Sequence, residues 1–296
     1  MKKNKWNIFE ALQVAGASFT PEQQSRIEKK INEFVSYTPR IGVLGKTGAG
    51  KSSLCNALFG QEICAVSDVE ACTRMPQDVL LQIGEGKGIT LLDVPGVGES
   101  GDRDTEYAAM YRNLLPELDL VLWVLKADDR AYSVDIDCYN NVVKPHLEAG
   151  KPFIVVLNQV DKIEPFREWS VADCRPGLTQ ARNIEAKVVS VAASFNLKQS
   201  QIIAVSAEEK FGLATLVDEI IFSLPDEKKL AIAREVATEN LSTKAKAEVK
   251  ESTSRVIGRI VEGAAKGAAV GAKFAGGVGA VVGAVLGGIG SFFKFW

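Results

Sequence analysis

One segment of eight residues limits the possible folds more than any other feature of this chain of 296 residues. Residues 45–52 read G-K-T-G-A-G-K-S, which fits the pattern G-x-x-x-x-G-K-S. Gly45 and Gly50 permit backbone angles that a Cβ would obstruct, so successive N–H groups can point at one phosphate. An apolar strand is predicted before the loop, over 40–44, and an apolar helix after it, which favours a P-loop over a glycine-rich surface turn.

Two residues of this loop carry most of its expected chemistry. Lys51 is expected to reach the β- and γ-phosphates, and the Ser52 hydroxyl is expected to ligate Mg²⁺. The helix that begins near Lys51 adds the positive end of its dipole. The predicted phosphate-binding residues are Gly45, Lys46, Thr47, Gly48, Ala49, Gly50, Lys51, Ser52 and Ser53.

A second motif follows a predicted strand at 88–92 and reads Asp93-Val94-Pro95-Gly96, which is D-x-x-G. Asp93 would stand at the carboxyl end of that strand, where it can hold Mg²⁺ through water. Gly96 can offer its N–H to a γ-phosphate. The motif alone is weak evidence because D-x-x-G is common in turns.

Two further motifs indicate which base is bound. The predicted strand 152–157 ends in N-Q-V-D, which is similar to the pattern N-K-x-D. Asp161 can accept two hydrogen bonds from the N1–H and N2 amine of guanine, a donor pair that adenine lacks. The predicted strand 202–205 runs into a Ser-Ala pair, similar to the motif whose backbone N–H contacts guanine O6. The predicted base-binding residues are Asn158, Gln159, Asp161, Ser206 and Ala207.

These four motifs occur in one order, each at the carboxyl end of a predicted strand, where open α/β sheets bind nucleotides. In this they resemble the Era-like superfamily of P-loop GTPases, from about Pro39 to Leu224. Gly45–Ser53 and its apolar helix also look similar to septin-like and immunity-related GTPases. The resemblance implies a three-layer α/β G domain with a mostly parallel sheet of about six strands. It also implies GTP and GDP as ligands, Mg²⁺ as cofactor, and hydrolysis of GTP to GDP and phosphate.

The resemblance extends to the metal and to catalysis. Thr73 is the sole threonine between Lys51 and Gly88, and it is predicted to be the switch I threonine that closes on Mg²⁺. An ordinary loop threonine is the alternative. The predicted metal ligands are Ser52, Thr73 and Asp93, and the predicted catalytic residues are Lys51, Thr73 and Gly96.

The sequence departs from the family pattern at three positions. Gln159 replaces the lysine whose stem covers the guanine face, so a lower affinity is expected. Val97 stands where Ras-like enzymes have the glutamine that orients water, which predicts slow intrinsic turnover and leaves the water-positioning group unidentified. Gly48 replaces the P-loop asparagine with which some relatives recruit K⁺.

Arg103 and Arg130 are either solvated loop charges or charge stabilisers, in cis or across a homodimer formed through the switch regions.

Composition disfavours several other function classes. The net charge of −2 argues against a protein that mainly coats nucleic acid. The single histidine, His146, disfavours His-rich zinc sites and Ser-His-Asp hydrolysis. The five cysteines have no C-x-x-C spacing, which indicates neither a zinc site nor a disulfide framework and predicts a cytoplasmic protein.

The chain is predicted to have four segments. A helix begins at Pro21, with Thr20 as N-cap and Gln23 completing a capping box. Residues before it loosely resemble a signal peptide, but Glu10 and Gln13 interrupt the apolar stretch, so a short amphipathic lead-in is favoured. The segments are an N-terminal helical extension at 1–38, the G domain at 39–224, a helical linker at 225–254, and a basic amphipathic, glycine-rich hydrophobic tail at 255–296.

The predicted tail concentrates both charge and apolar residues. Residues 241–296 hold eight basic and three acidic residues, a net charge of +5. Five charges fall on a helical arc of about 80°, a pattern suited to an anionic membrane surface. These charges are Arg255, Arg259, Glu262, Lys266 and Lys273.

Twenty uncharged residues follow, at 274–293. As a helix they would span about 30 Å, the thickness of a bilayer core. Small residues recur at every fourth position, as in packed membrane helices, but seven of the twenty are glycine, which weakens a helix. We predict association with, or insertion in, the inner membrane. The alternative is a tail that folds back on the G domain or stays flexible.

The leading prediction is a cytoplasmic, Mg²⁺-dependent GTPase with a slow intrinsic rate, coupled to a membrane or to self-assembly through its tail. One alternative is a GTP-gated binding module with negligible turnover, which Val97 favours. Another is an RNA- or ribosome-associated assembly GTPase, in which the basic stretch Lys244–Lys273 would serve RNA. Nothing after residue 224 resembles a KH domain with its basic G-x-x-G loop, which makes RNA the less favoured partner.

Overall fold

The computed structural model describes residues 19–46, 48–60, 77–82, 88–93, 115–147 and 150–265, and it describes 77–82 and 88–93 by their backbone. The chain divides into two compact units. The larger consists of Thr38–Leu224 and Glu235–Asn240, and the smaller of Met1–Tyr37, Pro225–Arg234 and Leu241–Trp296.

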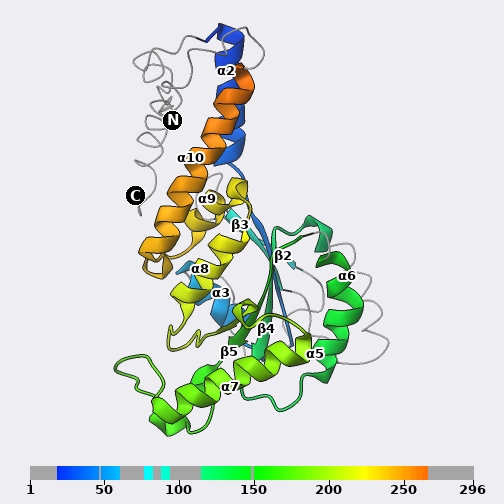
Figure 1. Ribbon diagram of the computed structural model, residues 1–296, viewed down its shortest axis with the longest axis vertical. Coiled ribbons are helices and arrows are strands. Elements are labelled where there is room, and N and C mark those ends of the chain that lie inside the picture. The colour runs from blue at the N-terminus through cyan, green and yellow to red at the C-terminus, as the bar shows by residue number, and fades with distance from the viewer. Residues whose placement is uncertain are drawn as a thin grey trace. The chain divides into compact units, whose positions relative to one another are not determined.

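A sheet of six strands, in the order β2-β3-β1-β4-β5-β6, forms the centre of the larger unit (Figure 1). Every neighbouring pair is parallel except β2 and β3, which are antiparallel. The prediction of a mostly parallel sheet of about six strands is therefore confirmed. The strands are β1 Arg40–Leu44, β2 Gln77–Gln82, β3 Gly88–Asp93, β4 Leu120–Lys126, β5 Phe153–Asn158 and β6 Ile202–Ala204.

Apolar runs explain why the central strands lie between two layers of helices. All six residues of β5 are buried, as are the first six residues of β4. Strands covered on both faces lose the alternation of polar and apolar residues that a half-exposed sheet shows. The helices of the larger unit are α3 Lys51–Phe59, α5 Ser133–Cys138, α6 Lys144–Leu147, α7 Leu178–Phe195 and α8 Leu213–Ser223.

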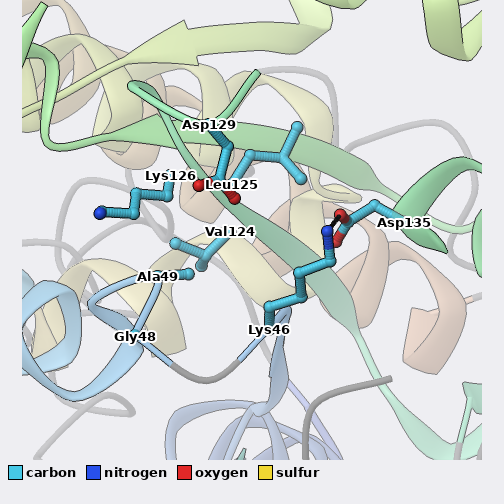
Figure 2. A pocket seen from close by; sticks show the side chains of 8 residues that line it. All are labelled: Lys46, Gly48, Ala49, Val124, Leu125, Lys126, Asp129 and Asp135. Carbon is cyan, nitrogen blue, oxygen red and sulfur yellow. Dashed lines mark ion pairs between the residues drawn. The ribbon is translucent and has the colours of Figure 1, made fainter. Parts of the chain in front are cut away.

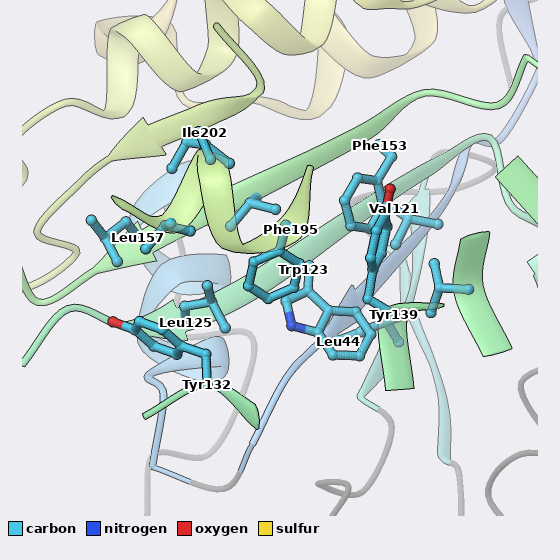
Figure 3. Packing of buried hydrophobic residues seen from close by; sticks show 14 of the residues in the cluster. Leu44, Val121, Trp123, Leu125, Tyr132, Tyr139, Phe153, Leu157, Phe195 and Ile202 are labelled. Atoms are coloured by element: carbon cyan, nitrogen blue, oxygen red, sulfur yellow. The ribbon is translucent and has the colours of Figure 1, made fainter. Parts of the chain in front are cut away.

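One face of the sheet packs against α5, α7 and the π-helical turn at 139–143 (Figure 3). Trp123 of β4 is fully buried in this layer, near the rings of Tyr139 and Phe195. The ring centroids of Tyr139 and Phe195 lie 5.5 Å apart, and those of Tyr139 and Phe153 lie 5.1 Å apart. Alternate strand residues point to the other face, where α3 and α8 pack (Figure 1).

The smaller unit contains α2 Pro21–Val35, α9 Asp226–Glu235 except for its last residue, and α10 Thr243–Ala265. Thr20 caps α2, because Gln23 N–H donates to its Oγ1 at 3.3 Å and its own N–H donates to Gln23 Oε1 at 2.9 Å. The predicted capping box is thus confirmed. Helix α2 packs against α10, and Arg234 of α9 donates to the Val35 carbonyl at 2.7 Å. Segments predicted at opposite ends of the chain therefore belong to one unit.

Seven charged side chains of α9 and α10 form an ionic cluster: Asp226, Glu227, Lys229, Glu248, Glu251, Arg255 and Arg259. Arg255 Nη2 lies 2.8 Å from Asp226 Oδ1, and Arg259 Nη2 lies 2.7 Å from Glu227 Oε1. The hydrogen bond from Arg255 lowers the pKa of Asp226 to about 2. Two cations of the predicted membrane-facing arc are therefore paired with carboxylates.

Helix α10 runs without a break across residues 254 and 255, where a boundary between linker and tail was predicted. No helix within the described residues is long and apolar enough to cross a bilayer. The uncharged run at 274–293, on which the membrane prediction depends, lies outside the described residues.

Candidate functional site

The carboxyl ends of the parallel strands bring the predicted motifs to one edge of the sheet. Val43 pairs with Asp93, Leu44 with Trp123, and Lys126 with Asn158, so the loops after β1, β4 and β5 leave the sheet side by side. The chain reaches this edge again after β6, at Ser206 and Ala207. Motifs separated by more than a hundred residues thus form one site.

The loop after β1 needs glycine at two positions. Gly45 has φ +143° and Gly50 has φ +83°, both in the region that side chains rarely adopt. A Cβ on Gly45 would collide with the Val124 carbonyl oxygen, and one on Gly50 would collide with the Asn158 amide. Lys51 lies across this loop, since its ammonium donates to the carbonyls of Gly45 at 3.0 Å and Lys46 at 3.2 Å.

Asn158 joins the loop after β1 to the loop after β6. Its amide nitrogen donates to the Ala49 carbonyl at 2.9 Å, and its Oδ1 accepts from the Ala207 N–H at 3.1 Å. The side chain is 1% exposed, so both bonds form away from water. Asn158 therefore fixes the two loops that would hold a phosphate and a base.

Gln159 makes a bond of its own to the loop after β1. It takes a left-handed conformation with φ 64°, and its Nε2 donates to the Gly48 carbonyl at 3.0 Å. Its Oε1 accepts from Lys162 Nζ at 3.3 Å. The amide that replaces the family lysine thus contacts the P-loop and has a cation beside it.

Asp161 faces a cavity of about 420 Å³ whose lining includes Lys162, Phe166, Trp169 and Glu209. Its Oδ1 is buried and accepts no hydrogen bond from the residues that the structure describes. Such an atom costs free energy unless a ligand supplies a donor. The backbone behind it is fixed, because the fully buried Gln180 donates to the Asp161 carbonyl at 3.0 Å.

The comparisons with known proteins agree with this geometry. Residues 40–159 match the family model described as 50S ribosome-binding GTPase. The uncharacterized protein YfjP of Escherichia coli K12 is 46% identical over 203 residues, which cover 68% of each chain. GTPase Era of Aquifex aeolicus is 28% identical over 193 residues, covering 64% of this chain and 58% of Era. The chain belongs to the Era-like P-loop GTPases.

Among solved structures, Era in complex with MgGDPNP and nucleotides 1506–1542 of 16S ribosomal RNA is 27% identical, with a TM-score of 0.48. The match covers 64% of this GTPase and 57% of that chain. GTPase Der of Streptococcus gordonii is 32% identical over 162 residues, 50% of this chain and 36% of Der. The chain thus spans little more than half of Era and about a third of Der.

A second cavity of the GTPase, of about 230 Å³, lies between the P-loop and the segment after β4 (Figure 2). Lys46 Nζ lies 2.6 Å from Asp135 Oδ2 there and forms an ion pair with it. Asp135 is 2% exposed, and desolvation raises its pKa, against the opposing effect of Lys46. No motif search finds Asp135, because only the tertiary fold brings it to the P-loop.

The loop after β4 is fixed at both ends. Tyr132 donates its hydroxyl to the Lys126 carbonyl at 2.9 Å, and Lys187 of α7 donates to the Asp129 carbonyl at 2.6 Å. The Lys187 ammonium also lies 4.8 Å from the centre of the Tyr132 ring. Arg130 is exposed on this braced loop, which is compatible with either reading of that arginine.

The structure describes two of the three predicted metal ligands. Ser52 lies in the first turn of α3, and Asp93 ends β3 beside β1. A hydroxyl and a carboxylate at one edge are oxygen donors, which suit Mg²⁺. Five residues discussed for phosphate binding, metal binding or hydrolysis lie outside the described residues: Thr47, Thr73, Gly96, Val97 and Arg103.

Proposed function

We propose that this GTPase binds GTP and GDP through Asp161 and hydrolyses GTP slowly with Mg²⁺. The observation that supports the choice of guanine most is the carboxylate of Asp161, a residue that lines a cavity and whose buried Oδ1 lacks a donor among the described residues. Guanine offers two adjacent donors to one carboxylate, whereas adenine would leave the carboxylate unpaired. Asn158, Gln159, Ser206 and Ala207 complete this end of the proposed site.

The phosphates would lie on the P-loop, Gly45–Ser53. Lys51 would move from the loop carbonyls onto the β- and γ-phosphates, and Gly96 would donate its N–H to the γ-phosphate. Ser52, Thr73 and Asp93 would hold Mg²⁺. When bound, the ion neutralises charge on the phosphate oxygens. Binding and hydrolysis then depend on positioning and electrostatics, with no covalent step on the protein.

Single-turnover hydrolysis tests this function. We expect a slow release of phosphate that requires Mg²⁺ and disappears in Lys51→Ala, which serves as the blank. A rate indistinguishable from the blank, together with tight GDP binding, would favour the second candidate, a GTP-gated binding module. Val97 is the observation behind that candidate, since valine cannot orient water.

We propose that the tail couples the bound nucleotide, GTP or GDP, to association with a membrane or with a second copy of the chain. Arg255 and Arg259 are already paired with carboxylates in the ionic cluster. A lipid or self-assembly contact would therefore depend on residues 266–296, which combine three lysines with the uncharged run. A homodimer through the switch regions is the proposed form of self-assembly, with exposed Arg130 available to the partner.

Co-sedimentation separates these partners. We expect the full chain, and not a chain ending at residue 265, to sediment with vesicles containing anionic lipid, more so with a GTP analogue than with GDP. Sedimentation with ribosomes instead of vesicles would support the RNA-associated alternative; Era itself has been solved with 16S ribosomal RNA.

A further inference from the structure

The Lys46–Asp135 pair is the most deeply buried ion pair that touches the P-loop among the described residues. Asp135 is 2% exposed and the side chain of Lys46 is 29% exposed. Figure 2 shows the two side chains pointing toward one another, Lys46 from the P-loop and Asp135 from α5. A carboxylate is costly to bury, and this one depends on a single cation, because no other charged side chain is paired with it in the described part of the chain.

Lys46 stands at the end of the P-loop that Asn158 and Gln159 do not contact, where the Lys51 ammonium also donates to the carbonyls of the loop. Asn158 and Gln159 hold the carbonyls of Ala49 and Gly48, on the side of the proposed base site. Lys46 lies at the start of the loop, away from those contacts. In an extended nucleotide the γ-phosphate is farthest from the base, so the start of the loop is where it would lie.

A free Lys46 would be drawn to a γ-phosphate, but that movement would leave a buried carboxylate without its cation. The cost of an unpaired buried charge exceeds the gain from one more partly exposed phosphate contact. Lys46 is therefore expected to stay on Asp135 when nucleotide binds. The ion pair, here called the strut, then holds α5 and the P-loop together, and the Lys46 ammonium does not move to the phosphate.

We propose that Asp135 is a positioning residue for GTP hydrolysis, which holds the γ-phosphate end of the P-loop in place through Lys46. The inference rests on the proposed function and adds a residue that no P-loop motif contains. A displacement of about 1 Å near reacting atoms is enough to lower a rate about a hundredfold. Loss of the strut should therefore affect hydrolysis more than binding of GDP, which has no γ-phosphate.

The test measures single-turnover GTP hydrolysis and the dissociation constants of GDP and a non-hydrolysable GTP analogue. Asp135→Asn should lower the hydrolysis rate about ten- to a hundredfold and change the GDP constant less than about threefold. Asp137→Asn is the matched control, since Asp137 is exposed on the same helix, and it should leave the rate unchanged.

A double variant separates positioning from folding. Lys46→Met with Asp135→Leu removes the pair without leaving a buried charge, so the fold should be kept while hydrolysis stays low. A parent-like rate in both Asp135→Asn and the double variant would overturn the inference. So would a GDP constant that worsens as much as the rate.

The two proposals can fail separately. If the parent chain hydrolyses no more GTP than Lys51→Ala, the proposed function fails. The inference is then decided by binding, because Asp135→Asn should still reduce the preference for the GTP analogue over GDP. An unchanged preference would overturn it.

Discussion

At the scale of residues, two glycines of the same loop differ in how much space a side chain would have. Gly45 has φ +143° and its missing Cβ would meet the Val124 carbonyl, whereas Gly48 has φ +80° and open space around it. Gly45→Ala should therefore cost more than Gly48→Ala, which carries only the backbone strain of about 1–2 kcal/mol. Thermal unfolding and GDP titration of both variants measure this. Equal loss of GDP binding in the two variants would contradict the geometry.

The sequence predicted candidate site residues that belong to motifs, and it did not predict the residues that reach this edge of the sheet through the fold. Asp161 was predicted as a guanine-binding residue because its type and spacing suit that base. Gln180, nineteen residues further on, holds the Asp161 backbone from the first turn of α7. Nothing local marks that glutamine, because its role depends on where a helix begins relative to a loop. The same holds for Asp135.

At the scale of elements, α7 has one apolar face in the core and another toward solvent. Phe195 is 1% exposed against Trp123 and Tyr139, whereas Val189 of the same helix is 43% exposed. Phe195→Ala should lower the free energy of unfolding by about 3–5 kcal/mol through lost burial and a cavity. Val189→Ala should change it by less than about 0.5 kcal/mol. Urea denaturation measures both, and similar losses would mean that α7 packs differently.

The contact between α9 and α10 predicts a dependence on acid. The pKa of Asp226 is lowered from 3.8 to about 2, first by its hydrogen bond with Arg255. The stabilisation is present above the unfolded pKa, and it is lost as the pH falls through about 4 toward about 2. Acid denaturation followed by circular dichroism should show a shallower loss in Asp226→Asn than in the parent. Parallel pH profiles would contradict the assignment.

The bounds of helices and strands were predicted well where they depend on residues that are close in sequence. The Thr20 capping box and the strands β1, β3, β5 and β6 were predicted to within about two residues, a usual margin. The packing of α2 with α10 was not predicted, because it joins residues some two hundred positions apart. Periodicity identifies a buried face but does not identify its partner.

At the scale of the whole molecule, the parallel sheet converts a linear order of motifs into one site. The loops after β1, β4, β5 and β6 converge because these strands follow one another in the sheet and each neighbouring pair is parallel. The family pattern made this arrangement predictable from sequence. The pairing of Arg255 and Arg259 was not, since their helical spacing looks the same whether they face lipid or carboxylates.

The central claim is that one carboxylate, Asp161, selects guanine, and base preference in Asp161→Asn tests it most directly. An amide presents a donor to the base, so it should reject guanine and accept xanthine, which carries an oxygen where guanine has an amine. We predict that hydrolysis and binding shift from GTP to xanthosine triphosphate by about a hundredfold or more. Unchanged preference for GTP in a folded Asp161→Asn chain would contradict the account.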